Sequence, residues 1–181
     1  MKQNIINESI RLFIHEGVEF KLIELATNLG ISKKTIYKYF KNKEDLLLQS
    51  VDAFFLKMHE EQTKIFNDSS LNELDKLKKL VLAMPSEISS INIRSLNEVK
   101  ITYPEVYKRI AHYFESDWEE TFDLIDKCKE KGLIKNINNN LFKVMYIACS
   151  ERIFDLSETD LDYETLQEKM VDILIGGIKN A

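Results

Sequence analysis

The first residues of the chain show the hydrophobic spacing of a helix. Over residues 4–16 a mainly apolar stripe recurs every three or four positions, made up of Ile5, Ile6, Ser9, Leu12 and Phe13. This interval keeps side chains on one face of an α-helix. Gly17 follows, where a helix commonly ends in a left-handed residue. The pattern therefore predicts an amphipathic helix over residues 4–16.

The rest of the chain repeats this pattern, with helix start and stop signals between the stripes. The further predicted helices cover about 22–29, 33–40, 43–66, 71–84, 86–103, 104–131, 140–157 and 162–179. Ser32 and Asn42 suit N-caps, and Pro104 suits a first helical residue. Because 181 residues include only five glycines and two prolines, we expect an all-α chain of about nine helices.

Positive charge is concentrated near the start of an otherwise acidic chain. The net charge is −5, yet residues 1–50 hold eight Lys or Arg and six Asp or Glu, a sum of +2, which leaves −7 for the remainder. Within GISKKTIYKYFKNKEDLL, residues 30–47, five lysines and two tyrosines precede the first acid, Glu44. A basic end on an acidic body favours a polyanionic partner.

Two short helices joined by NLGIS form a helix-turn-helix pattern in this basic region. Gly30 suits the positive φ that a tight turn between helices often needs. The small core expected here consists of Leu25, Leu29, Ile31, Ile36 and Phe40. Ile36 and Phe40 are four residues apart, so they share one buried face of the second of these helices.

Burial of that face turns side chains that suit DNA toward solvent: Lys33, Lys34, Thr35, Tyr37, Lys38 and Tyr39. The two tyrosines fall on opposite flanks, where a helix in a major groove meets a phosphate backbone on each side. Lys43 adds charge at the start of the following helix, whose free N–H groups also attract phosphate. The spacing indicates a DNA recognition helix, and the alternative is a solvated basic face.

The sequence IELATNLGISKKTIYKYFKNKEDLL, residues 23–47, resembles the DNA-binding segment of TetR-type transcriptional regulators. The shared pattern is an I/L-A pair, a glycine turn, S-x-x-T-x-Y-x-H/Y-F and then x-x-K-E-x-L. The resemblance covers about residues 3–50, and the remainder agrees in helical layout. It implies a helix-turn-helix DNA-binding domain over residues 1–46 and a helical ligand-binding and dimerisation domain over residues 47–181.

The resemblance also implies roles by position. The residues that would face bases or nearby phosphates are Lys33, Lys34, Thr35 and Lys38, and those that would hold the DNA backbone are Tyr37, Tyr39 and Lys43. One departure concerns the helix before the turn, which often opens with Ser or Thr in the family. Lys21 lies near that position in this chain, and its charge can replace the hydroxyl contact to phosphate.

A regulator of this kind is expected to bind an inverted-repeat operator in double-stranded DNA as a homodimer. The resemblance implies that a small-molecule effector, apolar or amphipathic, occupies a pocket in the body and weakens DNA binding. Repression is the leading expectation, and activation stays open. Neither the operator nor the effector follows from the sequence.

Large or soft side chains of the body are expected to line this pocket: Met84, Phe114, Trp118, Phe122, Tyr146, Cys149 and Phe154. Taken singly, each also suits plain packing in the core. The expected dimer interface lies on the last two helices, at Met145, Arg152, Leu156, Met170, Ile173, Leu174, Gly177 and Ile178. Periodicity alone fits packing within one subunit equally well, and the resemblance favours a bundle of four helices from two subunits.

An enzyme and a plain interaction module are the competing classes of function. The sequence contains no Ser/His/Asp or Cys/His grouping, phosphate-binding glycine loop or metal-ligand cluster, so we expect no catalysis, metal or cofactor. An interaction module would use the basic face to bind an acidic protein. Cys128 and Cys149 suit ordinary thiols in a reducing compartment. No apolar run suits a membrane span or a secretory signal, so we expect a cytoplasmic protein.

Overall fold

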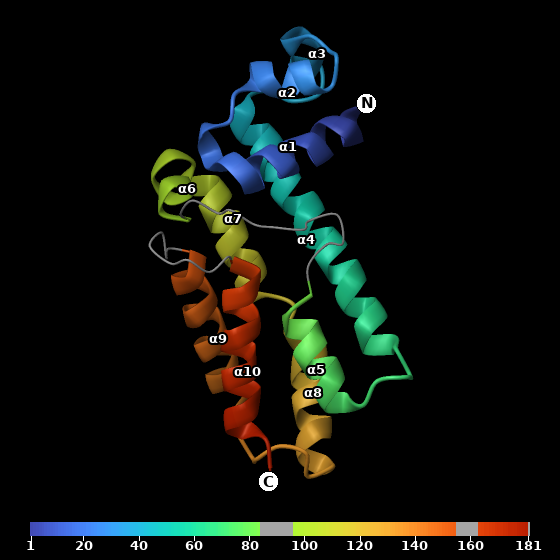
Figure 1. Cartoon of the computed structure of the whole chain (residues 1–181). Coiled ribbons are helices and arrows are strands. Elements are labelled where there is room, and N and C mark those ends of the chain that lie inside the picture. The colour runs from blue at the N-terminus through green and yellow to red at the C-terminus, as the bar shows by residue number, and fades with distance from the viewer. Residues whose placement is uncertain (84–95, 155–162, 181) are drawn as a thin grey trace.

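The chain is all-α, as its hydrophobic spacing predicts (Figure 1). The structure, a computed structural model, describes residues 1–83, 96–154 and 163–180. Within these ranges the only β-type pairing is an isolated bridge between Ile134 and Lys179. Helices α1–α3 form one end of the molecule, α4 runs away from them, and α5 and α8–α10 form the other end. None of the described helices is both long and apolar enough to cross a membrane.

Ten α-helices and one short 3₁₀ helix, η1, make up the described part of the chain. Their bounds are α1 (Lys2–Glu16), η1 (Gly17–Glu19), α2 (Leu22–Asn28), α3 (Lys33–Tyr37), α4 (Lys43–Asn67), α5 (Glu73–Val81), α6 (Leu96–Thr102), α7 (Pro104–Glu115), α8 (Glu119–Glu130), α9 (Asn139–Phe154) and α10 (Tyr163–Ile178). Helix α3 is shorter than expected: it ends at Tyr37, whereas the sequence predicted an end near residue 40.

The predicted start and stop residues act as the sequence indicates. The Ser32 hydroxyl accepts a hydrogen bond from the Thr35 amide at 3.2 Å, which caps α3. The Asn42 side chain accepts one from the Asp45 amide at 2.8 Å, which caps α4. Gly30 has φ +63°, a left-handed conformation that a side chain would strain. These local signals set the helix-turn-helix geometry.

One predicted helix is wrong: residues 104–131 form two helices, α7 and α8, and not one. The chain turns at Asp117, whose φ of +59° cannot belong to a right-handed helix. Helix α7 packs against α4 and α8 packs against α5, so the two apolar stripes face different partners. The segment holds no glycine or proline after Pro104, and its one signal of a new helix start is that Ser116 and Asp117 each stand three residues before a glutamate.

Buried apolar side chains gather in two clusters. The first joins α1–α4, α6 and α7, around side chains that include Ile5, Leu12, Leu25, Leu46 and Val106. The second joins α5 and α8–α10, around side chains that include Leu77, Leu124, Ile125, Phe142 and Val171. Helix α4 crosses the predicted domain boundary between residues 46 and 47, and the first cluster holds residues from both sides of it. The division at that point therefore remains a prediction.

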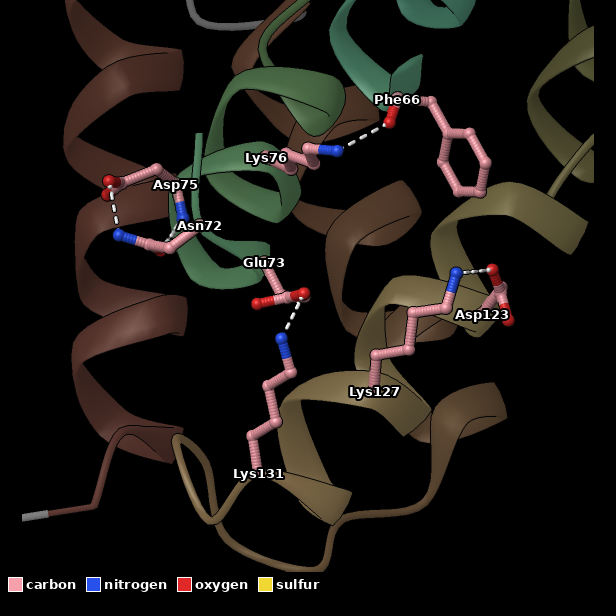
Figure 2. A network of polar contacts seen from close by, with 8 residues as sticks. All are labelled: Phe66, Asn72, Glu73, Asp75, Lys76, Asp123, Lys127 and Lys131. Carbon is pink, nitrogen blue, oxygen red and sulfur yellow. Dashed lines mark hydrogen bonds and ion pairs between the residues drawn. The ribbon is translucent and has the colours of Figure 1, made fainter. Parts of the chain in front are cut away.

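Polar contacts tie the far end of α4 to α5 and α8 (Figure 2). The Lys76 ammonium donates to the Phe66 carbonyl oxygen at 2.8 Å. The Lys127 ammonium lies 5.1 Å from the centroid of the Phe66 ring. Lys131, at the end of α8, forms an ion pair with Glu73 in the first turn of α5. The last turn of α4 is thus held by contacts from two other helices.

Neither cysteine forms a disulfide. Cys128 is buried in the second cluster, whereas Cys149 is exposed on α9. Burial raises the pKa of the Cys128 thiol to about 11, so this group stays protonated near neutral pH.

Replacing the N-cap of α4 should weaken the whole N-terminal end. We expect Asn42→Ala to lower the free energy of unfolding by about 1 kcal/mol, because the Asp45 amide loses its acceptor. Urea denaturation followed by circular dichroism measures this change. Asn42→Ser, which can still cap the helix, should stay close to the parent protein. Equal stability of Asn42→Ala and the parent protein would contradict this role.

Candidate nucleic-acid interface and ligand cavity

Helix α3 lies at one end of the molecule (Figure 1), and its segment exposes basic and aromatic side chains to solvent. Ile36 and Phe40 are buried against the rest of the helix-turn-helix, as expected. This orientation leaves the other side of the segment exposed, with Lys33, Lys34, Tyr37, Lys38 and Tyr39. The same short segment thus combines a buried anchor with a surface that suits a polyanion.

Thr35 and Lys21, the other two predicted DNA contacts near the turn, have surroundings of their own. The Thr35 hydroxyl is half-buried and lies 3.0 Å from the Ser32 hydroxyl, so it takes part in the cap of α3. Lys21 is exposed and stands directly before α2, as the N-cap residue. Its side chain makes no capping hydrogen bond. Lys21 therefore lies at the start of α2, where the family resemblance expects a contact to phosphate.

The Lys43 side chain turns inward, which differs from its predicted role. Its ammonium donates to the carbonyl oxygens of Val18 and Phe20, each at 2.5 Å, and lies 4.3 Å from the centroid of the Phe20 ring. Burial lowers the pKa of this lysine. The ammonium faces protein carbonyls and not the surface that carries the other lysines. Contact between this side chain and the DNA backbone therefore has no support in the structure.

Glu8 joins α1 to the helix-turn-helix, a link that the sequence did not reveal. One carboxylate oxygen accepts from Arg11 at 2.6 Å and from the Asn28 amide nitrogen at 2.8 Å. The Arg11 guanidinium holds the pKa of Glu8 below its usual range. The Glu8–Arg11 pair has helical i,i+3 spacing, but Asn28 lies 20 residues away. Only the tertiary structure brings it close.

A cavity of about 240 Å³ lies in the helical body, and α1 forms one part of its wall. Among the described residues, its walls come from α1, α4–α10 and the turn before α8. Three of the residues expected in a pocket line it, namely Phe114, Trp118 and Tyr146. Phe122 and Cys149 do not: Phe122 packs against Trp118 at a centroid distance of 5.9 Å, and Cys149 is exposed on α9. Met84 and the side chain of Phe154 lie outside the described residues.

Helix α4 supplies a large part of the cavity wall, which the sequence analysis did not predict. Phe54, Phe55 and Met58 line the cavity from this helix. The Phe55 ring stacks on that of Tyr113 with 4.4 Å between centroids and 11° between planes. Two adjacent phenylalanines make an apolar face wider than a single packing stripe needs. That width was the available signal for a second role of α4.

Several polar groups at the cavity wall are already hydrogen-bonded within the protein. The Tyr146 hydroxyl donates to the Val81 carbonyl oxygen at 2.6 Å. The Gln167 amide nitrogen donates to the Tyr163 hydroxyl at 2.6 Å. Burial raises the pKa of Tyr146 to about 12, so this phenol stays neutral. The wall therefore offers mainly ring faces and hydrocarbon.

The outer face of α9 and α10 exposes apolar side chains. Leu141, Val144 and Met145 stand out from α9, and Ile173 from α10 is 75% exposed. Among the residues expected at an interface, the exposed ones are Met145, Arg152, Ile173 and Gly177, and the half-buried ones are Met170, Leu174 and Ile178. Leu156 lies outside the described residues. The structure thus brings most of this set to one pair of neighbouring helices.

Known proteins share both the sequence and the architecture. Residues 5–49 match the family described as bacterial regulatory proteins of the tetR family. The chain is 31% identical over 182 residues to YvaF, an HTH-type transcriptional regulator of Bacillus subtilis (strain 168). This match covers 98% of this chain and 95% of the relative.

Solved structures agree with this fold. The reduced form of NemR from E. coli has a TM-score of 0.74 at 12% identity, with coverage of 99% of this chain and 97% of that chain. The fatty acid degradation regulator FadR from Bacillus halodurans has a TM-score of 0.66 at 22% identity, again over 99% and 97%. At these identities the likeness establishes the fold alone.

The short helices joined at Gly30, with α3 exposed on a helical body, define a helix-turn-helix DNA-binding protein. The relative that matches nearly the whole chain makes the assignment specific. The chain belongs to the TetR family of transcriptional regulators.

The inward position of Lys43 predicts a loss of stability when its side chain is removed. We expect Lys43→Ala to lower the free energy of unfolding by roughly 1–3 kcal/mol, because two carbonyl oxygens lose a charged donor. The exposed neighbour Lys41 provides the matched control, Lys41→Ala. Denaturation in urea compares the two variants. Equal stability of both would show that the inward contacts of Lys43 contribute nothing.

Proposed function

We propose that the protein is a dimeric repressor that binds an inverted-repeat operator and is released from it by a small molecule. The observation that carries this proposal is the course of α4. Its first turn packs into the helix-turn-helix, and residues further along the same helix line the cavity. A ligand in the cavity therefore touches the element that supports the DNA-binding end.

The proposed DNA contacts come from the exposed side of α3 and its flanks. Lys33, Lys34, Thr35 and Lys38 face bases or nearby phosphates in this proposal. Tyr37 and Tyr39 hold the DNA backbone through their hydroxyl groups, and Lys21 adds a phosphate contact at the start of α2. Lys43 has a structural role in this proposal, because its ammonium donates to the carbonyl oxygens of Val18 and Phe20, just before α2.

An ion pair between α4 and α7 links the cavity to the helix that supports the DNA-binding end. Asp52 on α4 accepts from Arg109 on α7 at 2.7 and 3.0 Å, and from the Tyr113 hydroxyl at 3.0 Å. Tyr113 also lines the cavity and stacks on Phe55. A ligand that displaces this stack would change how α4 lies against α7. It would favour a spacing of the two α3 helices that no longer fits successive major grooves, about 34 Å apart.

The exposed apolar face of α9 and α10 supports the proposed dimer. Large apolar side chains are rarely grouped in water without a partner. Gly176 and Gly177 leave open space on α10, since a Cβ built on either meets nothing within 4 Å. A second helix can therefore approach the backbone there. Two copies related by a twofold axis would bury both faces in a four-helix interface.

Selection of random duplex DNA by the purified protein tests the proposed function. We expect enrichment of one inverted repeat. Lys34→Ala should then bind this operator roughly tenfold more weakly, because an exposed lysine of α3 is lost. Lys79→Ala removes an exposed lysine from α5 and serves as the control. Failure to enrich any sequence would favour the plain interaction module instead.

A charge on the apolar face should separate the proposed dimer. We expect Ile173→Glu to shift the protein from dimer to monomer in analytical ultracentrifugation, because two buried carboxylates would face each other across the axis. Ile101→Glu makes the same change on α6, at a residue that is 83% exposed and outside this face. That control should remain dimeric. A dimeric Ile173→Glu variant would rule out this interface.

A further inference from the structure

The interior of the cavity is aromatic. Eight of the described lining residues are Phe, Tyr or Trp, and they come from α1, α4, α7, α9, α10 and the turn before α8. Trp118 and Tyr146 meet edge to face at a centroid distance of 5.6 Å. Ring faces carry partial negative charge, so such a wall attracts positive charge as well as hydrocarbon.

The edge of the cavity is acidic. Four of the described lining residues are exposed: His59, Asp117, Glu164 and Glu168. Three of them carry a carboxylate, and they come from the α7–α8 turn and from the first two turns of α10. No lysine or arginine is among the described residues that line the cavity. The carboxylates among the exposed described residues of the lining thus place negative charge where the cavity meets solvent.

Lys143 and Lys78, both in the described part of the chain, lie near this region and already have acidic partners. The Lys143 ammonium is 6.0 Å from the centroid of the Trp118 ring and pairs with Glu115 at 2.9 Å. Lys78 pairs with Asp172, and the charge of Glu168 also acts on it. Neither lysine lines the cavity. Each of these two lysine charges is thus paired with a carboxylate outside the cavity lining.

We infer that the cavity binds a lipophilic cation, with its hydrocarbon part among the aromatic rings and its positive charge at the acidic edge. An anionic amphiphile of the same size would meet three carboxylates and, among the described lining residues, no lysine or arginine. A neutral ligand would gain only the apolar contacts. The inference rests on the proposed function, since it names the chemistry of the proposed effector.

Three probes of similar shape and different charge test this inference. Benzyltrimethylammonium is the cation, neopentylbenzene replaces its nitrogen by carbon, and phenylmethanesulfonate is the anion. Trp118 is the one tryptophan of the chain and lines the cavity, so its fluorescence reports binding directly. With the full-length protein we expect the cation to bind about tenfold more tightly than the neutral probe. The anion should bind more weakly than both.

A triple variant tests whether the acidic edge makes the distinction. Asp117→Asn, Glu164→Gln and Glu168→Gln remove three charges and keep side-chain size, and Asn tolerates the left-handed conformation of residue 117. The variant should lose most of the preference for the cation over the neutral probe. The control variant combines Glu105→Gln, Asp123→Asn and Glu130→Gln, which are exposed acids outside the cavity. It has the same net charge and should keep the preference.

The outcomes separate this inference from the proposed function. Equal or tighter binding of the neutral probe or the anion would overturn the cationic class, as would binding of none of the three at millimolar concentration. A preference for the cation that persists in the triple variant would overturn the role of the three carboxylates. Binding of the cation without release of operator DNA, measured by anisotropy of labelled DNA, would support the cationic class and contradict the proposed effector mechanism.

Discussion

Helix α4 can remain one helix over 25 residues because each part of it packs against a different partner. In folded proteins most of the stability of a helix comes from tertiary packing and not from intrinsic helix propensity. Its start is held by the Asn42 cap and by Lys43 against the residues before α2, and its middle pairs with α7 through Asp52 and Arg109. Its far end accepts a hydrogen bond from α5 at Phe66. The DNA-binding end, the cavity and the far end of the body are therefore connected by one element.

Local sequence signals were enough to predict the elements of the N-terminal end. Ser32, Asn42 and Gly30 each act over three or four residues, so their effect can be read without knowing what surrounds them. The burial of Ile36 and Phe40 followed from their spacing. The break at Asp117 was missed because the helix-start signal at Ser116 and Asp117 is short, and the different partners of α7 and α8 are set by tertiary packing.

The residues of the candidate sites also divide into those that a local sequence pattern predicts and those that depend on tertiary contacts. Exposure on α3 follows from the period of a helix, so the orientation of Lys34 and Lys38 could be predicted. The inward turn of Lys43 could not, because it depends on carbonyl groups more than 20 residues away. The described lining residues of the cavity come from nine segments of the chain, so no single sequence pattern contains it. Bulk and softness alone could not separate Trp118, which lines the cavity, from Phe122, which packs beside it.

The contacts that hold Phe66 give α4 a mechanical property. If the helix pivots at this anchored end, it acts as a lever with the far end of the body as its fulcrum. At a rise of about 1.5 Å per residue, Phe55 lies roughly 18 Å from the Asn67 end and Lys43 roughly 36 Å from it. A sideways displacement at the cavity would then be about doubled at the start of the helix. A shift smaller than an atomic radius beside a ligand would become a movement large enough to misalign a DNA-reading helix.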